Sequence, residues 1–384
     1  MDLLLSQAQR LFIEDIQEFI TSEITPYLSR WYQEDIFPKG LLAKLSSRER
    51  LGFSQKEGLW QESTMSDNIV FYEYMSAASP GITVAILAHT LLGLYILYHW
   101  GNQEQRDKYF IAGIKGEKLA AFANTEPETG SDAANISLEG KEVGDSFLLN
   151  GTKMYITNGD LADFLIVSAR TDPKTARRSE GISLFVLDTA CEGLERIKLP
   201  KKGWLPSHLA RLSFKNCLVP GNNLIGELNE GYKLIMKTFT ASRIAIAAMA
   251  VGTAYGAYCL ALERARKREA FGKKIIEHQA KAYEFSTMLT KIDAARLLVQ
   301  RAAWLKDKRE DYIMASSQAK LFAAETAKTV TPWAADIFGA AGILETSPIS
   351  RYPGDAWAAS LGEGTSDTQK LIIWRQIMAQ LEKD

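Results

Sequence analysis

The sequence predicts an α+β fold with an N-terminal helical bundle, a middle antiparallel β-domain and a C-terminal four-helix bundle. Three observations predict it. Apolar residues recur at helical spacing near the start, short segments rich in β-branched and aromatic residues follow, and long helical patterns then return. This succession is typical of two helix bundles with a small sheet between them. We place the three domains at residues 1–120, 121–230 and 231–384.

The N-terminal domain begins with an amphipathic helix. Its apolar face is formed by Leu11, Phe12, Ile16, Phe19 and Ile20. The opening MDLLLSQAQRLFIEDI has no basic stretch, so we read it as part of a folded helix and not as a signal peptide. The apolar run at residues 82–100 is nearly long enough to cross a bilayer, but we interpret it as a buried core helix and expect no membrane span. We interpret His89, inside this run, as a hydrogen-bonded helix residue.

The middle and C-terminal domains differ in their patterns. The middle segments FLLNGTKMYITNG, FLIVSAR, ISLFVLD and LARLSFKNCLV are short and are separated by Gly, Pro and Asn-Gly, as in antiparallel strands. Beyond about residue 229, segments such as RIAIAAMAVGTAYGAYCLALERARKRE have helical periodicity. These patterns predict architecture and say nothing of chemistry.

Composition excludes several classes of function. The 45 basic and 46 acidic side chains nearly cancel, so we expect no nucleic-acid partner. The three cysteines, Cys191, Cys217 and Cys259, have neither CxxC nor metal-ligand spacing. We therefore expect no metal site, and reduced thiols in a cytoplasmic protein.

Two segments of the middle domain could hold a ligand. In AAFANTEPETGSDAANI, Gly130 allows main-chain N–H groups to converge on an anion and Ser131 adds a hydroxyl group. In GTKMYITNG, Tyr155 and Thr157 lie two residues apart on one strand face, where a ring and a hydroxyl group could hold a planar molecule. Alone, each segment is also typical of an ordinary loop or a half-buried strand.

Two further segments lie in the C-terminal domain. In RKREAFGKKIIEHQA, a cation, an aromatic ring and an amide could grip a pyrophosphate, although a solvated helix end looks similar. These residues are Arg268, Phe271 and Gln279. After DIFGAAGI, Glu363 stands between Gly362 and Gly364 on a turn, where little side-chain bulk shields its carboxyl group. Most glutamates in such turns are simply solvated.

Together the four segments resemble the acyl-CoA dehydrogenases, in the family's order and over nearly the whole chain. TEPETGSD is similar to the family's TEPxAGSD loop, KMYITNG to its K-aromatic-I-T-N-G strand, and REAFGKKIIEHQ to its R-x-x-FG…HQ helix. GEGTSDTQ is similar to the EGT segment that carries the family's catalytic base.

The resemblance implies a noncovalent FAD between the β-domain and the C-terminal helices. The flavin ring would be held by Phe122, Asn124, Thr125, Tyr155 and Thr157, with Thr157 near N5. Ser131 would lie near the pyrophosphate or the substrate's pantetheine arm, and Thr365 near the adenosine half. Gly130 and Asp367 would also be among the residues that bind FAD. Part of a neighbouring subunit's FAD would be held by Arg268, Phe271, Gln279, Asp336, Gly339 and Ala340. This implies a dimer and, by family habit, a homotetramer built as a dimer of dimers.

The resemblance also implies the reaction. Glu363 would remove the α-proton of an acyl-CoA while flavin N5 takes the β-hydride, giving a trans-2-enoyl thioester. Removing so weak an acidic proton needs a placed base and a stabilised thioester oxygen. Some relatives carry the base just before an arginine, where this chain has Ser242 before Arg243, so the base is assigned to Glu363. Substrate contacts would come from Ser131, Arg243, Gly362 and Gly364, and an electron-transferring flavoprotein would accept the electrons.

Several positions depart from the family pattern, among them Asn124, Ala270, Asp336, Asp367 and the Gly354-Asp355-Ala356 tripeptide. An aromatic residue usually precedes the base, so we expect Gly362 to enlarge the cavity for a branched, cyclic or bulky acyl group. Three alternatives stay open beside an acyl-CoA dehydrogenase of lipid metabolism or amino-acid breakdown. They are a dehydrogenase of an acyl group on a carrier protein, a flavin monooxygenase and a non-catalytic relative.

Overall fold

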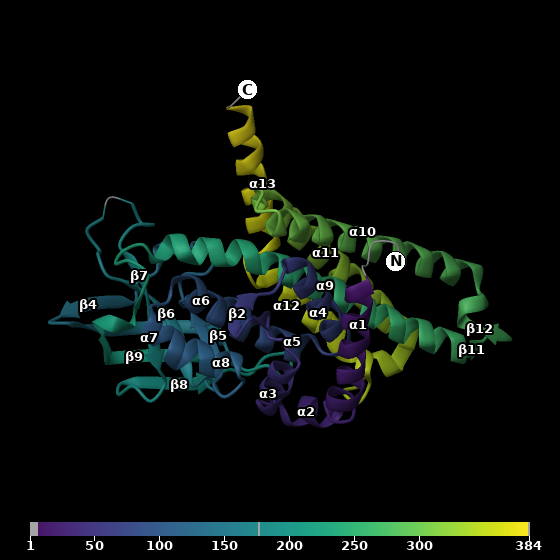
Figure 1. Ribbon diagram of the computed structural model, residues 1–384. Helices are drawn as coiled ribbons and strands as arrows, with labels where there is room; N and C mark the ends of the chain where they lie inside the picture. Colours follow the sequence, from purple (N-terminus) through teal and green to yellow (C-terminus); the bar gives the residue numbers. More distant parts are fainter. Residues whose placement is uncertain (1–6, 176, 383–384) are drawn as a thin grey trace.

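A β-sheet occupies one end of the molecule, and helices form the rest (Figure 1). The computed structural model describes residues 7–175 and 177–382, so the first six residues of the predicted N-terminal helix lie outside the described residues. The predicted order of helices, strands and helices is confirmed. Helices extend to Ile114, the main sheet runs from Ala120 to Ile225, and the long helices begin at Gly231.

The N-terminal part contains helices, as predicted, and one β-hairpin that was not predicted from the sequence. Its helical segments are α1 (Gln7–Phe19), η2 (Ile20–Ile24), α2 (Leu28–Glu34), α3 (Gly40–Ser47), α4 (Met65–Ala78), α5 (Pro80–Leu87), η3 (Ala88–Leu94), α6 (Tyr95–Trp100), α7 (Gln103–Gln105), η4 (Arg106–Phe110) and α8 (Ile111–Ile114). The hairpin pairs β1 (Phe53–Lys56) with β2 (Leu59–Glu62). Its strands have four residues each and are largely polar, so no apolar alternation marks them in the sequence.

The apolar run forms one helix, in which a π-helical segment, η3, joins α5 to α6. Among the described residues, two helices are long and apolar enough to cross a membrane, Pro80–Trp100 and Gly231–Lys267. The most apolar 18-residue stretch of each is largely buried inside the protein, to 94% and 83%. The predicted core helix at residues 82–100 is therefore confirmed. His89 is also as predicted: its Nε2 donates to the Gly113 carbonyl and its Nδ1 accepts from the Ala120 N–H.

The middle part is an eight-stranded sheet in the order β10-β7-β6-β4-β5-β9-β8, with β3 added alongside β6. The strands are β3 (Ala120–Ala123), β4 (Glu139–Val143), β5 (Ser146–Thr157), β6 (Phe164–Arg170), β7 (Ile182–Asp188), β8 (Leu194–Lys198), β9 (Leu209–Pro220) and β10 (Leu224–Ile225), with short 3₁₀ turns η5 (Ala133–Asn135) and η6 (Gly221–Asn223). The expected antiparallel sheet needs one correction. Strand β6 pairs in parallel with β3 and, at one residue pair, with β4, because these strands reach it through crossovers and not through hairpins.

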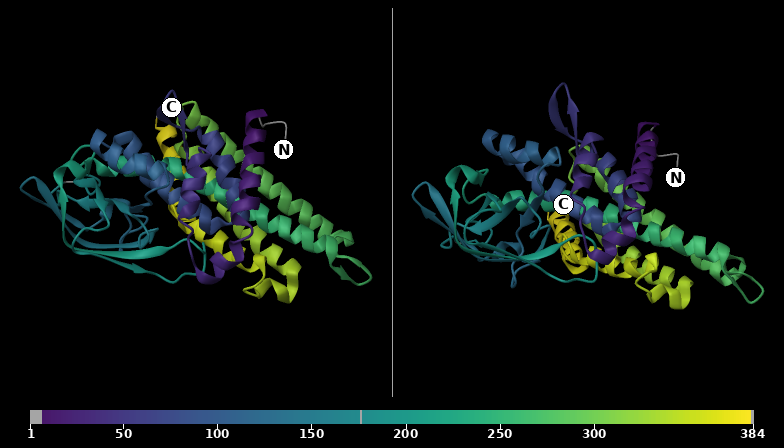
Figure 2. Two further views of the ribbon diagram at one scale, coloured as in Figure 1. Left: turned by 60° about the horizontal axis from the view of Figure 1, so that its bottom comes forward. Right: turned by 90° about the horizontal axis from the view of Figure 1, so that it is seen from below.

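The C-terminal part is built on three long helices, α9 (Gly231–Lys267), α10 (Gln279–Asp307) and α11 (Ile313–Phe338). Shorter segments complete it: β11 (Glu269–Ala270), β12 (Lys273–Lys274), η7 (Ile275–Glu277), η8 (Gly339–Ile343), η9 (Pro348–Arg351), α12 (Tyr352–Leu361) and α13 (Ser366–Leu381). The β11–β12 hairpin lies at the end of the bundle farthest from the sheet, and α13 projects from the body (Figures 1 and 2).

Helix α9 joins the N-terminal and C-terminal helices into one core, because small residues let α4 approach it closely. A Cβ atom built on Gly252 would lie 2.1 Å from the Glu73 carbonyl oxygen, and one built on Gly256 would lie 2.2 Å from that of Ala77. Ser76 Oγ donates across the same contact to the Met249 carbonyl, at 2.8 Å. This close packing fixes α9, which forms one wall of the cavity described next.

Candidate active site

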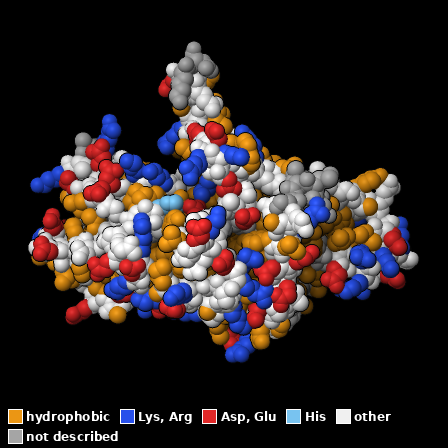
Figure 3. All heavy atoms as spheres, viewed as in Figure 1, with side chains coloured by type: hydrophobic (Ala, Val, Ile, Leu, Met, Phe, Trp, Pro, Cys, Tyr) orange, Lys and Arg blue, Asp and Glu red, His pale blue; other side chains and the backbone are white. Residues whose placement is uncertain are grey.

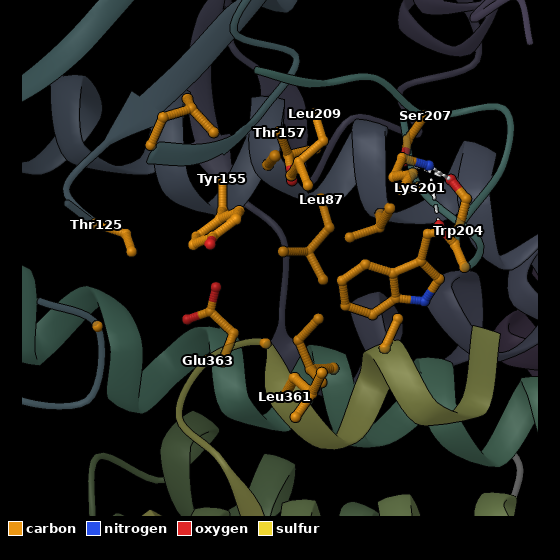
Figure 4. Close-up of a pocket in the computed structure, with 18 of the residues that line it drawn as sticks. Leu87, Thr125, Tyr155, Thr157, Lys201, Trp204, Ser207, Leu209, Leu361 and Glu363 are labelled. Atoms are coloured by element: carbon orange, nitrogen blue, oxygen red, sulfur yellow. Dashed lines mark hydrogen bonds between the residues drawn. The ribbon is translucent and has the colours of Figure 1, made fainter. Parts of the chain in front are cut away.

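A cavity of about 670 Å³ opens where the three parts of the chain meet. Its walls come from α5 and η3, from β5 and the loop after β3, from the loop between β8 and β9, from α9, and from α12 with the turn after it (Figure 4). The apolar part of the wall is formed by Val84, Leu87, Ala88, Leu92, Phe122, Ile156, Trp204, Leu209, Phe239, Ile246, Trp357, Ala358 and Leu361. Few charged groups reach the cavity, and Glu363 is one of them.

Glu363 lies on a sharp turn between α12 and α13. Both Glu363 (φ +56°) and Gly364 (φ +89°) have left-handed backbone conformations. For a glutamate this conformation costs about 1–2 kcal/mol, so other contacts must hold it. The Gln369 side chain donates to both of their carbonyl groups, at 3.1 and 3.0 Å, and the Lys320 ammonium group donates to that of Gly364. The turn therefore directs the Glu363 carboxyl group into the cavity, towards Tyr155 (Figure 4).

The surroundings of Glu363 adjust its basicity. Burial raises the pKa of its carboxyl group, while the Ser242 hydrogen bond and the charges of Arg243 and Lys320 oppose that rise. Ser242 Oγ donates to Glu363 Oε2 at 2.6 Å. Burial also lowers the pKa of Lys320, to about 8, although the Glu363 charge opposes this. A carboxylate whose pKa is raised by burial is a better proton acceptor than one in water.

The sheet contributes the opposite wall. Tyr155 lies in a bulge of β5, has φ +59° and is 57% exposed. The bulge interrupts strict alternation, so Lys153 and Ile156 are both buried although they are three residues apart. Tyr155 and Thr157 nevertheless line the same cavity, as the sequence predicts.

A buried network of hydrogen bonds around Lys153 and Glu126 stabilises the part of the sheet that forms this wall. The Lys153 ammonium group donates to Glu126 Oε1 at 2.8 Å, to the Asn124 carbonyl at 2.9 Å and to Ser168 Oγ at 3.1 Å. Ser168 in turn donates to the Asn124 side-chain oxygen at 2.8 Å. Burial lowers the pKa of Lys153 to about 8, but the Glu126 carboxylate opposes that shift. The network fixes the segment 124–126, which enters the cavity.

The loop between β8 and β9 closes another side. The Trp204 N–H donates to the Asp355 carboxylate on α12, and the Trp204 carbonyl accepts from Ser207 Oγ at 2.6 Å and from Lys201. Burial raises the pKa of Asp355 to about 7 and lowers the pKa of Lys201 to about 8. These contacts fix the main chain at Trp204, and its indole projects into the cavity near Leu361 (Figure 4).

The cavity suits a planar, polar-edged ring such as that of FAD. The hydroxyl groups of Thr125, Tyr155 and Thr157 border it, and none has a hydrogen-bond partner among the described residues. A Cβ atom at Gly130 would come no closer than 3.9 Å to Thr125, so the loop leaves open space there. Apolar side chains and free hydroxyl groups are together what an aromatic cofactor requires.

Eleven of the residues singled out from the sequence line this single cavity: Phe122, Asn124, Thr125, Gly130, Ser131, Tyr155, Thr157, Gly362, Glu363, Gly364 and Thr365. Arg243 does not line it; it is buried beside Ser242, and burial lowers its pKa. A substrate contact by Arg243 therefore stays a prediction.

The remaining predicted residues lie away from the cavity and are exposed. They are Arg268, Phe271, Gln279, Asp336, Gly339, Ala340 and Asp367. The ring of Phe271, at the tip of the β11–β12 hairpin, is 98% exposed. This chain does not bring them to its own cavity, so their assignment to a neighbouring subunit's FAD also stays a prediction.

The structure adds residues that the sequence analysis missed. Lys320 is fully buried beneath the turn that carries Glu363 (the base turn), whereas a lysine in a long helix is usually exposed. Trp204, Trp357 and Leu87 line the cavity from three separate elements, and no local motif marks them. One expectation needs correction: Gly362 does not simply open the cavity, because the Trp204 indole occupies the space beside it.

Family models cover nearly the whole chain. The models for the N-terminal, middle and C-terminal domains of acyl-CoA dehydrogenases match residues 6–117, 121–217 and 229–378. A short-chain specific acyl-CoA dehydrogenase of Clostridium acetobutylicum is 33% identical over 376 residues, which is 97% of this chain and 98% of that protein.

Solved structures have the same fold as this chain over nearly its whole length. A chain in a structure reported as the electron transferring flavoprotein of Acidaminococcus fermentans superposes with a TM-score of 0.92 at 33% identity, covering 98% of this chain and 99% of that one. The prolyl acyl carrier protein oxidase AnaB superposes with a TM-score of 0.90 at 26% identity, covering 97% and 99%.

Proposed function

Because the chain belongs to the acyl-CoA dehydrogenase family, an FAD-dependent family of oxidoreductases acting on CH–CH bonds, we propose that it oxidises an acyl-CoA thioester to the trans-2-enoyl-CoA with Glu363 as the base. The observation that carries the proposal is the Glu363 carboxyl group, which points into the cavity from a braced turn opposite Tyr155. FAD bound in this cavity would supply the acceptor for the β-hydrogen, which departs as hydride.

Each protein group then has a defined task. Ser242 holds Oε2 of Glu363, so the carboxylate has one orientation towards the substrate α-carbon. Burial raises the pKa of Glu363 and so strengthens it as a base. The main-chain N–H of Glu363 has no acceptor among the described residues and would donate to the thioester oxygen, where negative charge develops. The apolar side chains around the cavity would exclude water from the reacting carbons.

The partners follow from similarity. An electron-transferring flavoprotein is the proposed electron acceptor, supported by the matching chain in the Acidaminococcus structure. A homotetramer is proposed because α10 and α13 expose large apolar side chains, including Leu297, Trp304, Leu371 and Trp374. An acyl group on a carrier protein is the second candidate substrate, supported by the likeness to AnaB.

Anaerobic mixing of the FAD-loaded enzyme with a panel of acyl-CoAs tests the proposal. We expect one or more thioesters to bleach the flavin absorbance, and Glu363→Gln to abolish bleaching while FAD stays bound. Glu310→Gln, at an exposed position, is the matched control and should react like the wild type. Bleaching that persists in Glu363→Gln would show that the base lies elsewhere. Bleaching by carrier-bound acyl groups alone would favour the second candidate.

A further inference from the structure

Gly362 stands directly before the base, yet its backbone does not require glycine. Its φ of −63° and ψ of 152° are open to any residue. A Cβ atom built on Gly362 would, however, lie 2.9 Å from Cη2 and 3.4 Å from Cζ3 of the Trp204 indole. A side chain at position 362 would therefore meet the far end of the indole, which would have to shift to admit it.

Trp204 reaches this place from the opposite wall and is firmly held. Its main-chain N–H donates to the Asp355 carboxylate, on α12, and its main-chain carbonyl accepts from Ser207 Oγ and the Ser207 N–H at 2.6 and 3.0 Å. The backbone next to it also presses on α12, since a Cβ atom on Gly203 would lie 2.4 Å from the Gly354 carbonyl oxygen. These contacts fix the main chain at Trp204, and so the point from which the indole projects into the cavity.

From this geometry we infer that Trp204 sets the width of the acyl pocket beside Glu363 and selects a compact, apolar acyl group. The inference rests on the proposed function. The indole faces Leu87 and Leu361 across the cavity, so the acyl chain lies between apolar surfaces (Figure 4). A bulky substituent next to the reacting carbons meets the indole.

The cations at this side of the cavity do not favour an acidic acyl group. The Lys201 ammonium group donates to the carbonyl groups of Gly203 and Trp204, so it is engaged in holding the loop. Lys202 is exposed at the rim of the cavity. A terminal carboxylate that stayed between Trp204, Leu87 and Leu361 would be surrounded by apolar side chains, which is unfavourable.

A double-mutant cycle on Trp204→Ala and Gly362→Tyr tests the inference with two readouts. The first is kcat/KM for butyryl-CoA against 3-phenylpropionyl-CoA. Trp204→Ala should shift this ratio towards the bulky thioester by about tenfold or more, the scale on which apolar pockets discriminate size. The second is the melting temperature, which does not depend on turnover. Gly362→Tyr should lower it in the wild-type background, and Trp204→Ala should relieve part of that loss.

The control is Trp60→Ala, on the β1–β2 hairpin, which should leave the substrate ratio unchanged. An unchanged ratio in Trp204→Ala, with the wild type active, would overturn the inference, as would Gly362→Tyr melting at the wild-type temperature. A wild type that oxidises no acyl-CoA would refute the proposed function instead. The melting cycle would then still decide whether the indole fills the space at position 362.

Discussion

Substitution of Ser242 tests how the surroundings of Glu363 set the pKa of its carboxyl group. Its hydroxyl group donates to Glu363 Oε2 at 2.6 Å, and this hydrogen bond favours the charged carboxylate. In Ser242→Ala the donor is lost while burial and the nearby charges remain. The pKa of Glu363 should therefore rise further above its ordinary value.

The size of the change follows from the contact. A hydrogen bond to a charged group contributes about 1.5–3 kcal/mol, and about 1.4 kcal/mol corresponds to one pKa unit. Glu363 is only partly buried, since it faces the open cavity, so water can replace some of the lost bond. We therefore expect the loss of carboxylate stabilisation in Ser242→Ala to lie at the lower end of that range.

The assay is the pH dependence of kcat/KM. Only the deprotonated base removes a proton, so a higher pKa moves the acidic limb of the profile to higher pH. The plateau at higher pH should change little. Ser242→Thr, which keeps a hydroxyl group, should restore the wild-type limb. Thr240→Ala removes a hydroxyl group from the same helix away from the base and is the matched control. A limb that stays in place, or moves to lower pH, in Ser242→Ala would refute the reasoning.

Three further predictions concern stability. Gly252→Ala should lower the free energy of unfolding by about 1–3 kcal/mol, measured by urea denaturation, because the new methyl group would meet the Glu73 carbonyl oxygen. Lys153→Met should cost about 3–5 kcal/mol in the same assay, because it leaves the Glu126 carboxylate buried without its cation. Asp355 has a folded-state pKa of about 7, above its ordinary value, so its contribution to stability is full at low pH and is lost as pH rises through 7. Asp355→Asn should therefore reduce the fall in melting temperature between about pH 5 and pH 8.

Each stability prediction has its own control. Gly40→Ala adds a methyl group in open space at the start of α3 and should cost little, so equal losses at Gly40 and Gly252 would contradict the packing argument. Adding Glu126→Gln to Lys153→Met should recover part of the lost stability, and no recovery would mean that the pair is not the cause. Parallel melting curves for Asp355→Asn and the wild type across this pH range would show that Asp355 does not ionise there.

The features predicted best from the sequence are those that depend on residues close together in the chain. The order of helices and strands follows from local periodicity, and the turn carrying Glu363 follows from its flanking glycines and the EGT segment. The β1–β2 hairpin escaped prediction because its short polar strands have no periodic apolar pattern. The bulge at Tyr155 escaped it because strict alternation was assumed along β5.

Contacts between distant segments could not be predicted from the sequence alone. Lys320 supports the base turn from another helix, 44 residues before Gly364, and a lysine in a helix is usually exposed. The indole of Trp204 meets Gly362 only because the β8–β9 loop docks on α12. Gly362 was expected to widen the cavity because it lacks a side chain. The Trp204 indole, which comes from the β8–β9 loop on the opposite wall, fills that space instead.

The cavity is assembled from all three parts of the chain, and this has a thermodynamic consequence. No single part contains a complete binding surface, so a ligand in the cavity favours only the state in which the three are docked. By mass action, a cofactor present at about 100 times its dissociation constant adds about 2.7 kcal/mol to the stability of that docked state. Cofactor loading should therefore make the chain unfold as a single cooperative unit, with the sheet and the helices losing structure together.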